Sequence, residues 1–495
     1  MVYPDLDQFR RLSKEGNLIP VYREILADMD TPVSAFRKID DGKYSFLLES
    51  VEGGEKWARY SFLGSKPSIV VRSIGNCVEI VRHGKKETRS FLHDPLEAIK
   101  EILAEYKPVP NPGLPRFYGG AVGFIGYDVV RFFEKMPDRK KPGLGLPDIL
   151  FMITDTLVIF DNVTHKIKVV SNAHITNSSP AAAYKEAIEK IDAIIQKLTR
   201  RTKNPAALKT KPSPQKRSVL KSNFTPRLYE QAVLRAKEYI KAGDIFQVVP
   251  SQRFERRINV EPFEIYRALR LINPSPYMYF LRCGDATIAG TSPEVMVRLE
   301  RDRIDLRPIA GTRPRGSTEE EDKALEKELL EDPKERAEHI MLVDLGRNDV
   351  GRVSRPGSVH VSELMAIERY SHVMHIVSNV CGTIAGGKDA FDVVRASFPA
   401  GTVSGAPKIR AMEIIDELEP TRRGPYAGAV GYFGFSGNMD TCITIRTLVI
   451  SGDVAYIQAG GGVVADSVPS LEYQETVNKA KAMVRAVEMA ERGLE

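Results

Sequence analysis

The sequence is poor in cysteine, in histidine and in long apolar runs, and each shortage excludes a class of protein. The four cysteines among 495 residues form no CxxC pair and are too few for a disulfide framework, which fits a reducing compartment. The eight histidines form no HExxH motif and no His/Cys cluster, so a zinc site is not expected. No stretch approaches the roughly 18 uninterrupted apolar residues of a membrane span, and the first residues contain no apolar signal segment. These shortages predict a cytoplasmic protein that does not cross a membrane.

Positive charge is concentrated in one segment. The chain carries a net charge of +6, but ten Lys or Arg residues and no Asp or Glu lie between residues 193 and 228, so the rest of the chain is net negative. The segment is also rich in proline, a composition typical of a solvated linker. We therefore expect no nucleic-acid partner. We predict a basic flexible linker at residues 201–222, between an N-terminal half (1–200) and a C-terminal half (223–495).

The two halves repeat each other. YGGAVGFIGYD at residues 118–128 returns as YAGAVGYFGFS at 426–436, and FLGSKPSIVVR at 62–72 returns as IAGTSPEVMVR at 288–298. In each half a strand, a turn and a second strand lead into an amphipathic helix. Chance similarity among glycine-rich strands is the alternative explanation. We predict an α+β fold made from an internally duplicated αβ unit, in which each half supplies one β-sheet and the two sheets pack as a sandwich with helices on the outside.

Differences between the halves indicate where the chemistry lies. Arg446 in ITIRTLVI corresponds to Asp155 in MITDTLVI, and the glycine run QAGGGVV at residues 458–464 corresponds to SNAHI. Consecutive glycines let backbone N–H groups approach a carboxylate or phosphate without obstruction. We therefore predict that the second half binds an anion, to which the arginine-rich loop RPIAGTRPRG at residues 307–316 also points. The first half is expected to have another role.

Two pairs of glutamates stand near predicted helix starts. In EDPKERAEH, Asp332 can cap the following helix, and Glu335 and Glu338 then lie on one face. Glu472 and Glu475 repeat this spacing in PSLEYQET. Such pairs also cap helices and complement helix dipoles. Carboxylates can equally hold Mg²⁺, which prefers oxygen ligands and bridges to anionic substrates, so the pattern favours a Mg²⁺-bound organic acid.

A further element, FPAGTVSGAPK, occupies residues 398–408. Pro407 suits the first turn of a helix, and the preceding Gly-Thr-Val-Ser-Gly places hydroxyls and free N–H groups at the positive end of that helix. Helix capping would account for Ser404. It would not require Thr402 and two glycines.

These motifs together resemble the chorismate-utilising enzymes. The similarity rests on PIAGTRPRG, KERAEHIMLVDLGRND, HVMHIVSNV, FPAGTVSGAPK, ITIRT, QAGGGVV and LEYQET in this order, and it covers about residues 225–490. Within the family the chain is most similar to the large subunits of anthranilate synthases. Chorismate is a dicarboxylate, which is the anion that the arginine-rich loop is expected to meet.

The resemblance implies a cofactor, Mg²⁺, and a role for individual residues. The implied metal ligands are Glu338 and Glu475, with Glu335 and Glu472 in support. The implied chorismate contacts are Gly311, Thr312, Tyr426, Arg446, Gly460, Gly461 and Gly462. The implied catalytic residues are His375, Thr402, Glu335 and Lys479, among which His375 and the glutamates are the candidates for proton transfer.

Several activities fit this family. In the reaction most favoured, ammonia adds to chorismate as a hydroxyl leaves, and loss of enolpyruvate then gives anthranilate and pyruvate. Aminodeoxychorismate synthases typically carry a nucleophilic lysine where this chain has Ala310. Isochorismate and salicylate synthases are expected generally to lack the long N-terminal half. A catalytically silent tryptophan-binding scaffold is the alternative of another class, against which the intact set of acids, arginine and glycines argues.

The resemblance also implies a partner and an inhibitor. The chain has no Gly-x-Cys-x-Gly elbow of a glutaminase, so a separate glutamine amidotransferase subunit is expected to deliver ammonia within a hetero-oligomer. LLES at residues 47–50 and NPSPYM at 273–278 resemble the tryptophan feedback site of anthranilate synthases. The implied inhibitor contacts are Glu49, Ser50, Arg59, Pro276, Tyr277, Met278, Val430, Tyr432 and Cys442.

Overall fold

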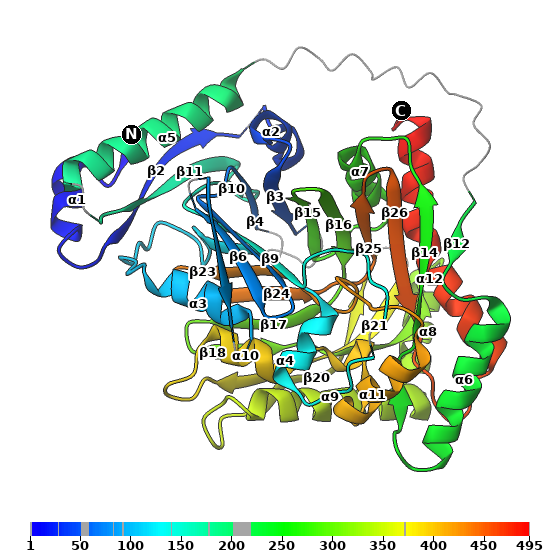
Figure 1. Cartoon of the computed structure of the whole chain (residues 1–495). Coiled ribbons are helices and arrows are strands. Elements are labelled where there is room, and N and C mark those ends of the chain that lie inside the picture. Colours follow the sequence, from blue (N-terminus) through cyan, green and yellow to red (C-terminus); the bar gives the residue numbers. More distant parts are fainter. Residues whose placement is uncertain are drawn as a thin grey trace.

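A computed structural model describes most of the chain. The described residues are 2–27, 29–50, 59–82, 84–91, 94–139, 141–176, 179–200, 219–370 and 373–494. They form two twelve-stranded sheets that pack face to face, and helices cover the outer surface of each sheet (Figure 1). This arrangement confirms the predicted sandwich with helices on the outside. Most of the predicted linker lies outside the described residues.

The first sheet contains strands from both halves of the chain. Its order is β1 (Val2–Tyr3), β2 (Leu18–Leu26), β11 (Lys166–His174), β10 (Thr156–Asp161), β4 (Tyr60–Ser65), β3 (Tyr44–Glu49), β15 (Tyr277–Cys283), β16 (Ala286–Ser292), β25 (Thr447–Ser451), β26 (Val454–Gly460), β14 (Ser251–Arg257) and β12 (Lys221–Ser222). Its outer face packs on α1 (Leu6–Leu12), α2 (Pro32–Ile39), α5 (Pro180–Thr199), α7 (Pro262–Ile272) and α12 (Pro469–Arg492).

The second sheet is likewise shared. Its order is β19 (Ile309–Pro314), β21 (Val373–Thr383), β18 (Arg303–Leu306), β17 (Val295–Glu300), β24 (Met439–Ile443), β23 (Ala429–Gly434), β8 (Gly120–Ile125), β9 (Ile149–Thr154), β5 (Ile69–Ile74), β6 (Cys77–Arg82) and β7 (Lys85–Ser90), with β20 (His360–Arg369) beside β21. It packs on α3 (Leu96–Ala104), α9 (Pro333–Gly351), α10 (Ala390–Ser397) and the short η1 (Tyr127–Val129) and α4 (Val130–Phe133).

The remaining elements lie around the second half. They are α6 (Pro226–Lys241), α8 (Glu319–Glu331), η2 (Gly401–Val403), α11 (Lys408–Leu418), and the two-stranded pair β13 (Gln247–Val248) and β22 (Gly405–Ala406). Among the described helices, none combines the length and the apolar content needed to cross a bilayer.

The strand orders reveal the duplication. Each sheet has a central pair of equivalent strands, one from each half. Outward from this pair, the equivalent strands of the two halves occur in the same spatial order. β3 pairs antiparallel with its counterpart β15, and β8 pairs antiparallel with its counterpart β23. The prediction that each half supplies its own sheet is therefore wrong. Each half contributes to both sheets because equivalent edge strands pair with each other across a pseudo-twofold axis.

Of three local signals at helix starts, one is confirmed and two are wrong. Asp332 caps α9, since its carboxylate accepts hydrogen bonds from the N–H groups of Lys334 and Glu335. Pro407 lies at the N-cap of α11 and not in the first turn as predicted. The expected capping role of Ser404 is not observed, because its hydroxyl donates to the Ala400 carbonyl.

Candidate active site

The glycine run lies where β26 ends and leaves no room for side chains. A Cβ on Gly460 would lie 2.8 Å from the Pro250 carbonyl oxygen and 2.9 Å from the Tyr426 hydroxyl. A Cβ on Gly462 would lie 2.6 Å from Nε2 of Gln247. Glycine is therefore required at both positions, because the backbone packs against Pro250, Tyr426 and Gln247 without space for a Cβ.

Arg446 is positioned immediately before β25. Its φ of +49° is uncommon for a residue with a side chain, and such strained positions cluster at functional sites. Its Nη1 donates to Oδ1 of Asn273 at 3.2 Å. Burial lowers the pKa of Arg446, although an arginine stays cationic at neutral pH. A half-buried cation held by a neutral amide is available to an anionic ligand.

The residues of the first half that correspond to Arg446 and the glycine run differ in charge and size. Leu157 pairs with Val170 in the first half as Leu448 pairs with Ile457 in the second, which makes His174 the counterpart of Gly461. Asp155 replaces Arg446, and its carboxylate accepts a hydrogen bond from Lys190 at 2.9 Å. An imidazole thus replaces the glycine, and an ion pair replaces the free cation. Among the described residues, the predicted anion-binding set of Arg446 and the glycine run has no equivalent in the first half.

The four predicted metal ligands approach one another from two helix starts. A Cβ on Gly461 would lie 3.1 Å from Oε2 of Glu472 and 3.6 Å from the carboxyl carbon of Glu475. Burial raises the pKa of Glu338, and the charges of Glu335 and Glu475 raise it further. Burial and the Glu475 charge likewise raise the pKa of Glu472. Carboxyl groups from α9 and α12 therefore face one another.

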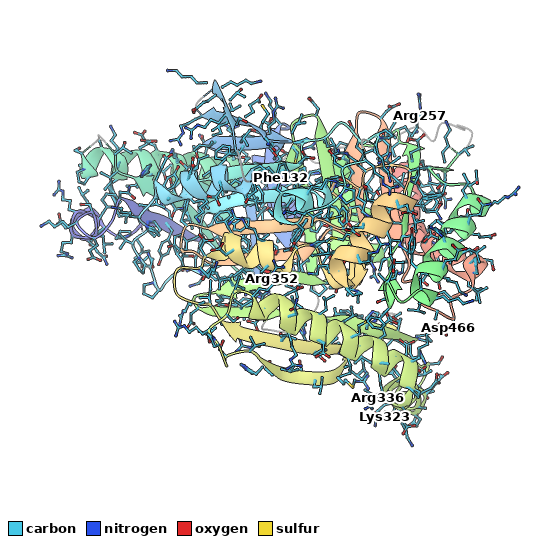
Figure 2. The ribbon with its side chains drawn as sticks, turned by 60° about the horizontal axis from the view of Figure 1, so that its bottom comes forward. Phe132, Arg257, Lys323, Arg336, Arg352 and Asp466 are labelled. Carbon is cyan, nitrogen blue, oxygen red and sulfur yellow. The ribbon has the colours of Figure 1, made fainter. Side chains whose placement is uncertain are left out.

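The two helix starts are also tied together. Nζ of Lys334 in α9 donates to Oδ2 of Asp466, in the loop before α12, at 2.8 Å. Figure 2 shows Asp466 at the same end of the molecule as Arg336, in the first turn of α9. Among the described residues no preformed cluster of three or more metal-ligating side chains is present. Oε2 of Glu472 is nevertheless buried without a hydrogen-bond partner in this part of the chain, and an all-oxygen donor set suits Mg²⁺.

Lys479 lies beside the glycine run. Its Nζ donates to the Gly460 carbonyl at 3.0 Å and pairs with Oε1 of Glu475 at 2.7 Å. The Glu335 carboxylate pairs with Arg313 at 3.2 Å, and a Cβ on Gly311 would lie 3.2 Å from Glu335 Oε2. Lys479 thus contacts Gly460 and Glu475, and Glu335 lies beside Gly311.

The arginine-rich loop behaves differently from the prediction. Its three arginines pair with carboxylates of the protein: Arg307 with Glu368, Arg313 with Asp332 and Arg315 with Asp322. They hold β19 against α8, α9 and β20. The loop therefore faces the site through the backbone of Gly311, whose φ is +68°, and through Thr312.

His375 is a neutral base in this arrangement. It pairs with Thr312 in the second sheet, and its Nδ1 lies 2.9 Å from the Gly311 carbonyl oxygen and 3.1 Å from the Thr312 hydroxyl. Because a carbonyl only accepts, Nδ1 carries the proton and Nε2 presents a lone pair. Burial lowers the pKa of His375, and the charge of Arg446 lowers it further.

The sequence analysis missed Glu294, which lies between β16 and β17. Burial raises the pKa of Glu294 to about 8, while the Thr402 hydroxyl and the charges of Arg446 and Lys479 oppose the shift. The carboxyl is therefore mostly protonated at pH 7 and can donate a proton. The comparison of halves that identified Arg446 also contains this signal, since Ser68 stands at the corresponding position of FLGSKPSIVVR.

Gln247 and Asn273 were also missed. Gln247 Nε2 donates to Oε1 of Glu338 at 3.0 Å and lies against Gly462. Asn273 orients Arg446, as described above. Gln247 stands in none of the motifs named above, and Asn273 stands in NPSPYM, which was assigned to the inhibitor site, so its contact with Arg446 is visible only in the folded chain.

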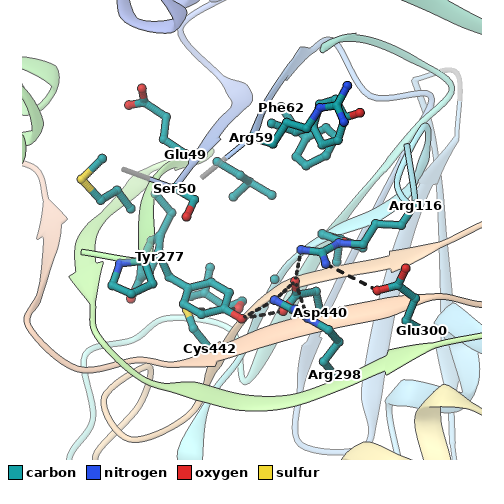
Figure 3. Close-up of a pocket in the computed structure, with 18 residues that line it drawn as sticks. Glu49, Ser50, Arg59, Phe62, Arg116, Tyr277, Arg298, Glu300, Asp440 and Cys442 are labelled. Carbon is teal, nitrogen blue, oxygen red and sulfur yellow. Dashed lines mark hydrogen bonds and ion pairs between the residues drawn. The ribbon is translucent and has the colours of Figure 1, made fainter. Parts of the chain in front are cut away.

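Apart from the candidate active site, a cavity of about 360 Å³ lies between the two sheets, near the pseudo-twofold axis. All nine residues predicted for the inhibitor site border it (Figure 3). Unpredicted charged residues form one wall: Asp440 pairs with Arg116 and with Arg298, both at 2.9 Å, and accepts a hydrogen bond from the Tyr277 hydroxyl at 2.8 Å. The equivalent strands β3 and β15 bring the two predicted segments together.

Individual side chains of this cavity differ in orientation. The Glu49 carboxylate accepts hydrogen bonds from Tyr266 and Arg270 of α7, so it lies on the helix side of the first sheet and points away from Asp440 (Figure 3). Arg59 pairs with Asp161 at 2.8 Å. The Ser50 hydroxyl is buried and has no hydrogen-bond partner among the described residues, so it is available to a ligand.

Comparison with known proteins agrees with this geometry. A family model described as chorismate binding enzyme matches residues 51–485. The chain belongs to the family of chorismate binding enzymes. Anthranilate synthase component 1 of Acetivibrio thermocellus and that of Aquifex aeolicus are each 51% identical to it, and each alignment covers 99% of both chains.

Solved structures of family members show the same fold. The crystal structure of anthranilate synthase component I from Streptococcus pneumoniae superposes with a TM-score of 0.76 at 37% identity, covering 93% of this chain and 99% of the other. The menaquinone-specific isochorismate synthase of Escherichia coli superposes with a TM-score of 0.69 at 18% identity, covering 97% of this chain and 98% of the other. The second likeness concerns the fold alone. Because it covers almost the whole of both chains, it contradicts the expectation that isochorismate synthases lack the long N-terminal half.

Proposed function

We propose that this chain is the chorismate-converting subunit of an anthranilate synthase, which forms anthranilate and pyruvate from chorismate and ammonia in tryptophan biosynthesis. The observation that carries the proposal is the predicted anion site, formed by Arg446 and the glycine run, beside a protonated Glu294. The first half has neither this site nor a counterpart of Glu294. The full-length similarity to anthranilate synthase components supports it.

Substrate binding follows from the charges. Arg446 and the N–H groups of the glycine run neutralise and orient the carboxylates of chorismate. Glu338 and Glu475, with Glu335 and Glu472, would hold Mg²⁺, which when bound supplies charge neutralisation and electron withdrawal at the substrate carboxylate.

Proton transfer is assigned from the protonation states. Glu294 is uncharged at neutral pH and donates a proton to the departing C4 hydroxyl as ammonia adds at C2. His375 is also neutral, and its Nε2 accepts the C2 proton as enolpyruvate leaves with the C–O electron pair and the ring becomes aromatic. The resulting imidazolium returns the proton to the enolpyruvate, which becomes pyruvate. Lys479 and Thr402 orient the surrounding groups.

The ammonia donor is a separate glutamine amidotransferase subunit. The relatives are named as component 1, which supports a second component in this protein as well. Free ammonia replaces that subunit in the reaction. The cavity between the sheets binds tryptophan as a feedback inhibitor, a proposal supported by its lining and by the unpartnered hydroxyl of Ser50.

The proposal is tested with the purified chain, chorismate, Mg²⁺ and ammonium, with anthranilate followed by its fluorescence and products separated by chromatography. We expect anthranilate and pyruvate in equal amounts, and inhibition by tryptophan. A main product of 4-amino-4-deoxychorismate or isochorismate would contradict the assignment. Tryptophan binding without any chorismate turnover would support the scaffold alternative.

A further inference from the structure

Arg423 lies in the segment between α11 and β23, beneath the candidate active site. Its side chain is 1% exposed, and the side chain of its ion-pair partner, Glu419, is 3% exposed. The Nη2 of Arg423 lies 2.6 Å from Oε1 of Glu419, and Nε lies 3.0 Å from Oε2. The pair is therefore bidentate and excluded from water.

The guanidinium also bonds to two active-site segments. Its Nη1 donates to the carbonyl of Val403, the residue after Thr402, at 2.7 Å. Its Nη2 donates to the carbonyl of Val249 at 2.6 Å, just before β14. The guanidinium carbon lies 5.5 Å from the ring centroid of Tyr426. One side chain thus contacts the Thr402 turn, the start of β14 and a proposed substrate residue.

Glu419 extends this contact to the glycine run. Its Oε1 accepts hydrogen bonds from the backbone N–H and the hydroxyl of Ser251, each at 2.8 Å. Ser251 pairs with Gly460 in the first sheet. The position of Gly460 relative to Thr402 is therefore set through Glu419 and Arg423.

The first half builds the same strands without this pair. Ile19 pairs with Ala173 as Ser251 pairs with Gly460, so a buried isoleucine stands at the position of Ser251. Pro115 precedes Tyr118 by three residues, as Arg423 precedes Tyr426. The repeat that has no anion site therefore has no equivalent pair. A buried ion pair is a weak source of stability, so the presence of this pair in one repeat and its absence from the equivalent position of the other indicate a functional role.

We propose that Arg423 is a positioning residue for the reaction, an inference that rests on the proposed function. With Glu419 it holds the Thr402 turn, the Gly460 end of β26 and the ring of Tyr426 at fixed relative positions. Arginine is required because its rigid fork reaches separate acceptors at once, whereas the single ammonium of lysine does not.

The test is the double substitution R423M/E419L in the full chain. Removing one partner would leave an unpaired buried charge, but replacing both with apolar residues of similar size retains stability. We expect an unchanged thermal midpoint, a raised KM for chorismate and a kcat/KM reduced about 100-fold, since displacements near 1 Å cost this much. R423K should also fold, and its kcat/KM should recover less than a tenth of the activity that R423M/E419L loses relative to wild type.

The matched control is R256M/E491L. Arg256 is 6% exposed and pairs with Glu491 at 2.6 Å, on the same strand as Ser251 but five residues further along. The R256M/E491L variant should have the kcat and KM of wild type. Partial unfolding of R423M/E419L would lower kcat without changing KM, and this result, or a kcat/KM within threefold of wild type, would overturn the inference. Wild-type chain that forms no anthranilate in the same assay would overturn the proposed function and this inference with it.

Discussion

The substitution E294Q tests the buried acid on which the proposed chemistry depends. The pKa of Glu294 is about 8 in the folded protein, compared with about 4.5 for the ordinary carboxyl. Between these values the folded state keeps a proton that the unfolded state releases, so stability present below about pH 4.5 is lost as the pH rises to about 8. One pKa unit corresponds to about 1.4 kcal/mol, so the whole loss is about 5 kcal/mol. Glutamine does not titrate and escapes this loss.

The assay is urea unfolding of wild type and E294Q at pH 6, 7 and 8. All other titrating groups cancel in the difference between the two proteins. The unfolding free energy of E294Q relative to wild type should therefore rise by about 1 kcal/mol per pH unit, or roughly 2 kcal/mol over this range, since the slope falls to half its maximum as the pH reaches the pKa of Glu294. E300Q, which changes a side chain that is 48% exposed at the end of β17, should show no such trend. A difference independent of pH for E294Q would refute the assignment of Glu294 as a protonated acid.

Three further predictions concern the metal, the inhibitor and the product. E338Q should abolish anthranilate formation and weaken Mg²⁺ binding in calorimetric titration while the thermal midpoint is retained, and normal Mg²⁺-dependent turnover would remove the ligand assignment. S50F should abolish tryptophan binding by filling the cavity, with ammonia-dependent turnover unchanged; tryptophan binding of wild-type strength would exclude this cavity as the site. A310K should acquire a covalent adduct from chorismate, detected as added protein mass, and an unmodified chain would show that residue 310 does not face the reacting ring.

The amino-acid sequence by itself determined the duplication and the start of α9 at Asp332, and it predicted which half binds the anion. Repeated strands with equal spacing identify equivalent elements, and a run of glycines or an Asp332 cap has a local meaning that needs no partner. The exchange of Arg446 for Asp155 could be read directly because it stands inside a repeat. Each of these signals depends on neighbours along the chain.

Tertiary structure decided what depends on neighbours in space. Pairing of equivalent strands across the pseudo-twofold axis divided each sheet between the halves, which no local pattern specifies. The loop arginines, including Arg313, are occupied by carboxylates that come from other segments. The raised pKa of Glu294 arises only because folding removes it from water, and Arg423 reaches Val403 and Val249 only in the folded chain. Burial and long-range contact, which set a pKa or an orientation, are properties of the folded chain and not of residue type.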